Sequence, residues 1–222
     1  MLTQTIYQTA PGVRFFDLAL GKQVLIAWAT AFGGYADIEL TYTLFSLVCV
    51  GSHLGSPESF PPIMGAFRRD AWSVRQMWGV CWHQMMRRPC GEAGRQVKRL
   101  LGLKTGGFAS RYTQIGVAFV VSGLMHHLGA VKNRWDDGGT HQMLYFLMQP
   151  LAYIFEDLVI SIGKQRGIKS SPVVKVIGYA WVFAWFSFSM RYMAAYQPLS
   201  WLEEEGLPSV VRPVLKTVSL SK

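Results

Sequence analysis

The sequence has little charge and few cysteines for its length, and both shortages exclude classes of protein. Only 16% of the 222 residues are charged, whereas 50% are hydrophobic; ordinary globular domains have about 25% charged residues. The three cysteines form no CxxC pair and no disulfide framework, and no zinc-type ligand cluster appears, so we expect no metal site. Residues 1–16 lack the features of a signal peptide, so membrane insertion would depend on internal segments. The composition favours a membrane protein over a soluble one.

Acidic residues are also scarce, and the resulting excess of basic residues indicates which kinds of partner the chain could bind. The chain has 13 Asp and Glu against 22 Lys and Arg, a formal net charge of +9. Such an excess suits nucleic acid, an anionic membrane surface or an anionic substrate. The basic residues concentrate between apolar segments rather than in one block. We therefore expect membrane topology and an anionic cosubstrate, and no nucleic acid.

Five apolar stretches could cross a bilayer as helices, which takes about 20 mostly apolar residues. Several of them contain charged residues, which for any one stretch favours a core helix of a soluble α-protein. Five such stretches with many Trp and Tyr favour the membrane instead. We predict an all-α fold, a polytopic transmembrane helical bundle with residues 1–222 as a single domain. The predicted spans are residues 13–34, 35–51, 112–131, 142–163 and 173–196.

The loops between these stretches alternate in charge. The central loop, residues 52–111, carries ten Lys or Arg, and residues 164–175 carry four with no acid. Residues 132–141, between them, have two basic and two acidic residues. Cytoplasmic loops of membrane proteins are enriched in Lys and Arg. The alternation predicts that the central loop and residues 164–175 are cytosolic in a multi-pass protein, which we expect in the endoplasmic reticulum.

His126 lies inside the apolar stretch 112–131 and is the most informative residue of the sequence. Ionisable groups within a bilayer are costly and usually face a cavity or a partner. Histidine is the commonest general base, and Ser122 and Gly123, one turn earlier, allow a close approach. Two interpretations stay open, a general base and a buried histidine satisfied by a neighbouring helix. The adjacent His127 points to a different helix face.

A second cluster of aromatic and basic side chains lies in the central loop, at residues 73–88. The pattern predicts an amphipathic helix at the cytosolic interface, with tryptophans and arginines on one flank. By pattern alone this is a membrane-surface helix with aromatic anchors. A functional interpretation adds polar groups at the mouth of a cavity and arginines that meet the phosphates of an anionic cofactor. The cluster consists of Trp78, Trp82, His83, Gln84, Arg87 and Arg88.

Three segments together resemble the wax synthase-like branch of the membrane-bound O-acyltransferase family. They are FPPIMGAF at residues 60–67, SVRQMWGVCWHQMMRR at 73–88 and FVVSGLMHH at 119–127. The family pattern runs PPxF, then SxxxFWGxxWHQxxR, then FxxSGxxH, in the same order. The resemblance covers about residues 35–196, and the chain is most similar to fungal members that acetylate terpenoid and meroterpenoid natural products.

The resemblance implies an activity and roles for particular residues. In this family an intramembrane histidine deprotonates an acceptor hydroxyl, which attacks the thioester of an acyl-CoA bound from the cytosol. His126 would be the general base, and His83 would position or polarise the thioester. No bound cofactor is expected; the partners would be acetyl-CoA or another acyl-CoA, a lipophilic alcohol and the lipid bilayer. Substrate would be bound by Trp78, Trp82, Gln84, Arg87, Arg88 and Ser122.

The chain departs from the family pattern in two residues and in length. Met77 stands where an aromatic residue is usual, and His127 where an acidic residue is common; neither change removes a proposed catalytic group. Family members are usually longer and have additional N-terminal spans. We therefore expect this chain to be an N-terminally short member.

Three hypotheses for the function are held against one another. The first is an O-acyltransferase that moves acetyl from acetyl-CoA to a hydroxyl of a terpenoid or meroterpenoid. The second is a long-chain acyl-CoA:alcohol acyltransferase that makes wax esters. The third is a truncated, inactive membrane relative that binds lipid or partners an enzyme. The presence of both His83 and His126 favours an enzyme.

Overall fold

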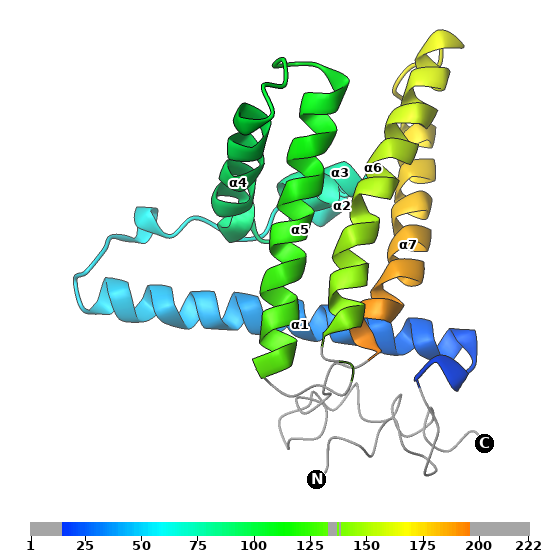
Figure 1. The fold of residues 1–222 in the computed structure, drawn as a ribbon. Helices are drawn as coiled ribbons and strands as arrows, with labels where there is room; N and C mark the ends of the chain where they lie inside the picture. The colour runs from blue at the N-terminus through cyan, green and yellow to red at the C-terminus, as the bar shows by residue number, and fades with distance from the viewer. Residues whose placement is uncertain (1–14, 133–136, 138, 196–222) are drawn as a thin grey trace.

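The computed structural model describes residues 15–132, 137 and 139–195, and every regular element in these ranges is helical (Figure 1). The predicted all-α fold is therefore confirmed for this part of the chain. The longer helices are α1 (Leu20–Gly51), α4 (Arg87–Leu100), α5 (Phe108–Lys132), α6 (Thr140–Gln165) and α7 (Pro172–Ala194). The short elements are η1 (Phe15–Asp17), η2 (Pro57–Ser59), α2 (Phe67–Asp70), α3 (Val74–Gln76), η3 (Met77–Cys81) and η4 (Gln84–Met86).

Three helices of the described residues, α5, α6 and α7, are long and apolar enough to cross a membrane. They correspond to the predicted spans 112–131, 142–163 and 173–196, the last of which is described to residue 195. Lipid can cover large apolar side chains that no protein atom covers. The protein is therefore membrane-associated through these helices. Their exposed apolar side chains include Leu128, Leu151, Leu158, Val176, Ile177 and Phe183.

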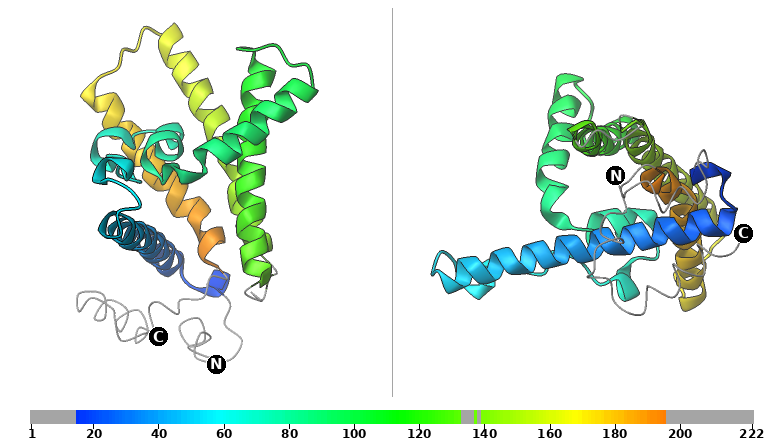
Figure 2. Two further views of the ribbon diagram at one scale, coloured as in Figure 1. Left: turned by 90° about the vertical axis from the view of Figure 1, so that its left-hand side faces the viewer. Right: turned by 90° about the horizontal axis from the view of Figure 1, so that it is seen from below.

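The two N-terminal predicted spans, residues 13–34 and 35–51, do not form separate helices; residues 13 and 14 lie outside the described residues. Helix α1 runs without interruption across the predicted boundary. No proline lies within it, and the pair Gly33–Gly34 weakens a helix without ending it. With 32 residues, α1 is about 48 Å long. It lies crosswise to α5, α6 and α7, and its C-terminal half extends beyond them (Figures 1 and 2).

Helix α1 is attached to the other helices mainly through α7. The indole nitrogen of Trp28 donates to Ser187 Oγ at 2.9 Å, and the Trp28 ring stacks on Phe183 with 5.3 Å between centroids. Nearby, Arg191 donates to Oε1 of Gln23 at 3.0 Å. These contacts fix the N-terminal half of α1 against the C-terminal half of α7.

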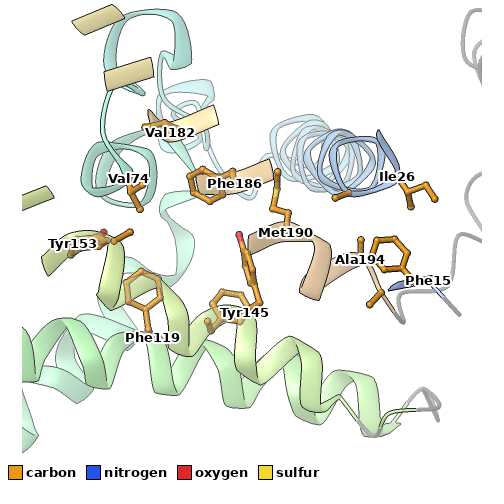
Figure 3. Packing of buried hydrophobic residues seen from close by; sticks show 14 residues of the cluster. Phe15, Ile26, Val74, Phe119, Tyr145, Tyr153, Val182, Phe186, Met190 and Ala194 are labelled. Atoms are coloured by element: carbon orange, nitrogen blue, oxygen red, sulfur yellow. The ribbon is translucent and has the colours of Figure 1, made fainter. Parts of the chain in front are cut away.

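The core of the protein is aromatic and lies where α5, α6, α7, α1 and α3 meet (Figure 3). Phe119 of α5, Tyr145 of α6 and Phe186 of α7 point toward one another there. The indole of Trp78, from η3, packs among them, with centroid distances of 5.6 Å to Phe119 and 6.0 Å to Phe186. Burial of such rings is a large favourable contribution to folding. The core therefore holds the central loop against the three long helices.

Residues 73–88 do not form the single amphipathic helix that their pattern predicted. The chain forms α3 and the π-helical turn η3, becomes extended at Trp82 (ψ 148°), stays non-helical at His83 (ψ 123°), and then turns again in η4. The amphipathic helix of this loop is α4, whose first residue is Arg87. The break occurs because this stretch pairs with another part of the central loop.

Candidate functional site

The WGxxWHQ segment is shaped by a helix cap and a π-turn. Ser73 Oγ accepts a hydrogen bond from the backbone nitrogen of Gln76 at 3.1 Å and so begins α3. Directly afterwards η3 widens the turn, and the backbone nitrogen of Trp82 donates to the carbonyl of Met77 at 2.7 Å. Isolated π-turns occur frequently at functional sites. The turn directs Trp78 into the core and leaves His83 beyond its end.

The FPPIMGAF segment lies beside this turn. The backbone nitrogen of Gly65 donates to the carbonyl of Cys81 at 2.8 Å, and that of Gln84 donates to the carbonyl of Ile63 at 3.1 Å. A Cβ atom at Gly65 would lie 2.3 Å from the carbonyl oxygen of Val80, so only glycine allows this approach. The first sequence motif therefore holds the backbone of the second on both sides of His83.

His126 lies on the side of α5 that faces α6. Gly123, one turn earlier, leaves room for Met143 and Phe146, because a Cβ atom there would lie 2.7 Å from Met143 Sδ. The His126 ring stacks on Phe146 at 4.6 Å between centroids and remains exposed. The ring is thus packed against the neighbouring helix and is still accessible to another molecule.

The imidazoles of His83 and His126 lie within electrostatic range of one another in the fold. The His83 ring is half-buried beside Trp82, at 5.6 Å between centroids. Burial lowers the pKa of His83, so this imidazole is neutral at pH 7. A neutral imidazole has one donor and one acceptor nitrogen. Nδ1 of His83 is buried and has no partner among the described residues.

The other predicted site residues fall into two groups. Gln84 and Ser122 are half-buried near the two histidines in sequence, and the Gln84 amide nitrogen donates to the carbonyl of Trp82 at 2.6 Å. Arg87 and Arg88 are exposed at the start of α4. Along the chain Gln84 is adjacent to His83 and Ser122 lies one turn before His126, and the exposed arginine pair is open to an anionic ligand.

Three polar residues of α6 support the site, and the sequence motifs did not identify them. Glu156 is buried and accepts hydrogen bonds from the backbone nitrogens of Val74 and Arg75, at the beginning of α3. Asp157 binds the Arg75 guanidinium at 2.8 Å. Gln149 Oε1 accepts from the indole nitrogen of Trp78 at 3.2 Å. The only signal in the sequence is an acidic pair inside an apolar stretch.

Two basic connections lie at the same end of the long helices. Figure 1 shows the link between α4 and α5 and the link between α6 and α7 together at the top, and Figure 2 agrees. The first link and its flanks carry Lys98, Arg99, Lys104 and Arg111, and the second carries Lys164, Arg166, Lys169 and Lys175. The two connections thus share one end of these helices, and their placement in the cytosol stays a prediction.

Within residues 15–132, 137 and 139–195, no three His, Cys, Asp or Glu side chains gather closely enough to hold a metal ion. The polar group within electrostatic range of His126 is instead the imidazole of His83, and the amide of Gln84 follows His83 in the chain. Such a set can move a proton and donate a hydrogen bond.

Known proteins resemble this chain over most of its length. The acetyltransferase ple2 of Rhodocybe pseudopiperita is 35% identical over 156 residues, which are 69% of this chain and 41% of the relative. The acetyltransferase sirH of Leptosphaeria maculans is 33% identical over 187 residues, 82% of this chain and 45% of the relative. The O-Mevalon transferase macI of Penicillium terrestre is 32% identical over 186 residues, which are 74% of this chain and 42% of the relative.

The chain spans less than half the length of these three relatives. No solved structure matches it. Residues 60–148, which contain all three sequence motifs, match the membrane bound O-acyl transferase family. The resemblance that the motifs predicted is therefore confirmed: the chain is similar to the membrane bound O-acyl transferase family and to fungal acetyltransferases.

Proposed function

We propose that the protein is an acyl-CoA-dependent O-acyltransferase that moves an acetyl group from acetyl-CoA to a hydroxyl of a lipophilic terpenoid or meroterpenoid. The observation that carries the proposal is the electrostatic proximity of two histidines from distant motifs. His126 is accessible on α5, and His83 lies within electrostatic range of it. The printed names of ple2 and sirH, both acetyltransferases, support the choice of acetyl.

The reaction needs one proton acceptor and one hydrogen-bond donor. His126 takes the proton of the acceptor hydroxyl as its oxygen attacks the thioester carbonyl carbon. The new C–O bond forms, the C–S bond breaks, and the proton passes from His126 to the departing CoA sulfur. His83, being neutral, donates its N–H to the carbonyl oxygen while negative charge develops there. One such donor contributes about 3 kcal/mol.

Acyl-CoA carries phosphates, which need cations near the mouth of the site. Arg87 and Arg88 are exposed at the start of α4, shortly after His83. Guanidinium groups bind phosphate in a bidentate way. We assign the end with the two basic connections to the cytosol, by the positive-inside rule, and the membrane to the endoplasmic reticulum. CoA would then approach from the cytosol and the acceptor from the lipid.

Another acyl donor within the same chemistry is favoured by one relative. The name O-Mevalon transferase, given to macI, is not that of an acetyltransferase. A long-chain donor, which would make the protein a wax ester synthase, is a separate alternative that this name does not address. Competition between acetyl-CoA and long-chain acyl-CoA in the assay below separates these donors.

The proposal is tested with microsomes that contain the full chain, labelled acetyl-CoA and a panel of terpenoid alcohols. Label should enter an ester, and CoA thiol should appear in equal amount. His126→Ala should lower the rate at least about 100-fold, because it removes the general base. His127→Ala is the matched control and should keep the rate. An inactive membrane relative would release no CoA and form no ester with any acceptor, and equal rates for the two variants would remove His126 from the chemistry.

A further inference from the structure

Helix α6 carries a buried polar side chain at every seventh residue. Gln142, Gln149 and Glu156 are at most 5% exposed. Seven residues are close to two helical turns, so the three side chains lie on one face of the helix. All three bond to α7: Gln142 donates to the carbonyl of Met193 at 2.7 Å, and the other two accept from indole nitrogens of α7 tryptophans. Polar groups buried in this way are costly unless they are paired.

Gln149 is completely buried and makes three hydrogen bonds. Its Oε1 accepts from the indole nitrogens of Trp78 at 3.2 Å and Trp185 at 3.0 Å. Its Nε2 donates to the carbonyl of Tyr145 at 2.9 Å. These bonds fix the positions of the amide oxygen and the amide nitrogen. The Trp78 indole, which precedes His83 by five residues, is thereby tied to α6 and α7 together.

Glu156 holds the other end of the same segment. It accepts from the backbone nitrogens at the beginning of α3, the second of them at 3.2 Å from Arg75, and from the Trp181 indole at 2.9 Å. The same helix carries Phe146, on which His126 stacks. Helix α6 therefore contacts the segment that ends in His83 and also the ring of His126.

We propose that Gln149 is a positioning residue for acyl transfer: by accepting the Trp78 indole N–H it fixes the segment that ends in His83 relative to His126. The inference rests on the proposed function. Gln149 touches no reacting atom in this account and acts through Trp78, with Glu156 as the second attachment. Misplacement of a reacting group by about 1 Å can cost roughly a hundredfold in rate. Loss of this hydrogen bond should therefore affect turnover more than substrate affinity.

The test compares Gln149→Met with Gln142→Met in the purified full chain, in detergent or nanodiscs. Both changes replace a buried amide on the same face of α6 by an apolar side chain of similar volume, and both should lower the unfolding temperature. Only Gln149→Met should lower kcat, by roughly ten- to a hundredfold, with the KM for acetyl-CoA changed by less than about twofold. Gln142→Met should keep kcat within about twofold of the wild type.

A second variant separates positioning from general destabilisation. Trp78→Phe keeps an aromatic ring in the core, although a smaller one, and removes the indole N–H. It should reproduce the loss of kcat, and the double variant with Gln149→Met should lose no more than either single one, because both remove the same hydrogen bond. Losses that multiply would overturn the proposal.

Two further outcomes are decisive. Equal loss of kcat in Gln142→Met and Gln149→Met, or full kcat in Gln149→Met, would contradict the positioning role. A wild-type protein without any acyl transfer would instead contradict the proposed function itself, so the two failures are told apart by the wild-type measurement.

Discussion

Gly123 determines how closely α5 approaches α6 next to the candidate base. A Cβ atom there would lie 2.7 Å from Met143 Sδ and 3.1 Å from Cβ of Phe146. Since the His126 ring stacks on Phe146, the same contact sets where the imidazole lies relative to α6. Glycine in membrane helices commonly serves such close packing. The glycine of the SGxxH motif is thus explained by helix packing.

We expect Gly123→Ala to lower the free energy of unfolding by about 1–3 kcal/mol, because the added methyl overpacks the α5–α6 contact. Gly116→Ala, on the same helix, is the control: no atom lies within 4 Å of a Cβ there, so its stability should be unchanged or slightly higher. Thermal unfolding in detergent measures both. Equal stability of the two variants would contradict the close approach.

Individual site residues differed in how well the sequence predicted them. His83 and His126 belong to local motifs, so their resemblance to a family pattern identified them without a structure. Gln149 and Glu156 could not be found in this way, because their partners lie 71 and 82 residues away in the chain. An amide or acid in an apolar stretch shows that a partner must exist, and only the fold shows which one.

At the scale of single elements, the amphipathic helix α4 begins with the arginine pair that follows the WHQ residues. Gly94 allows α4 to pack closely on α5, since a Cβ atom there would lie 2.8 Å from the carbonyl oxygen of Gln114. Arg95 and Arg99 of the same helix pair with Glu92 at 2.8 and 2.9 Å. Arg87 and Arg88 lie nearer to His83 in the chain, which makes them the better candidates for CoA phosphates.

Reversing charge in the double variant Arg87→Glu and Arg88→Glu should raise the KM for acetyl-CoA at least about tenfold and leave kcat almost unchanged. Each charge-assisted hydrogen bond contributes about 1.5–3 kcal/mol to binding. It is equally strong in the bound substrate and in the transition state, so its loss raises the KM and does not change kcat. Lys132→Glu, exposed at the opposite end of α5, is the control. Steady-state kinetics at two salt concentrations measure the effect. An unchanged KM would remove the arginine pair from the CoA site.

The elements that the sequence predicted correctly are the strongly apolar helices, because length and hydropathy alone identify them. The prediction was wrong where tertiary contacts determine the backbone conformation. Residues 73–88 have the composition of an amphipathic helix, but hydrogen bonds to Ile63 and Gly65 hold the chain in a non-helical conformation at Trp82 and His83. Helix α1 shows the reverse case, in which two predicted segments join because nothing between them ends a helix.

At the scale of the whole molecule, the arrangement of the charged connections agrees with a single orientation in the membrane. The α4–α5 and α6–α7 connections lie at one end, and the C-terminus of α5 lies at the other (Figure 1). Charge alternation along the sequence predicted this pairing of loops, because topology in a membrane depends on loop composition more than on packing. The crosswise course of α1 has no such signal in the sequence.

The orientation can be tested with single cysteines in sealed microsomes. Lys104→Cys and Lys169→Cys, in the two basic connections, should react with an impermeant maleimide added outside, whereas Lys132→Cys should react only after permeabilisation. All three variants also carry Cys49→Ser, so that no native cysteine reacts; Cys81 and Cys90 can stay because they are buried. Labelling of position 132 from outside, or protection of either basic connection, would contradict the assignment.

The central claim is that acyl transfer takes place between His83 and His126. It is tested most directly by a crystal structure of the protein with an unreactive acetyl-CoA analogue, in which a methylene separates the sulfur from the carbonyl. The account predicts the carbonyl within hydrogen-bonding distance of the His83 ring, a free position for the acceptor hydroxyl beside His126, and the CoA phosphates near Arg87 and Arg88. An acetyl group bound away from both histidines would contradict it.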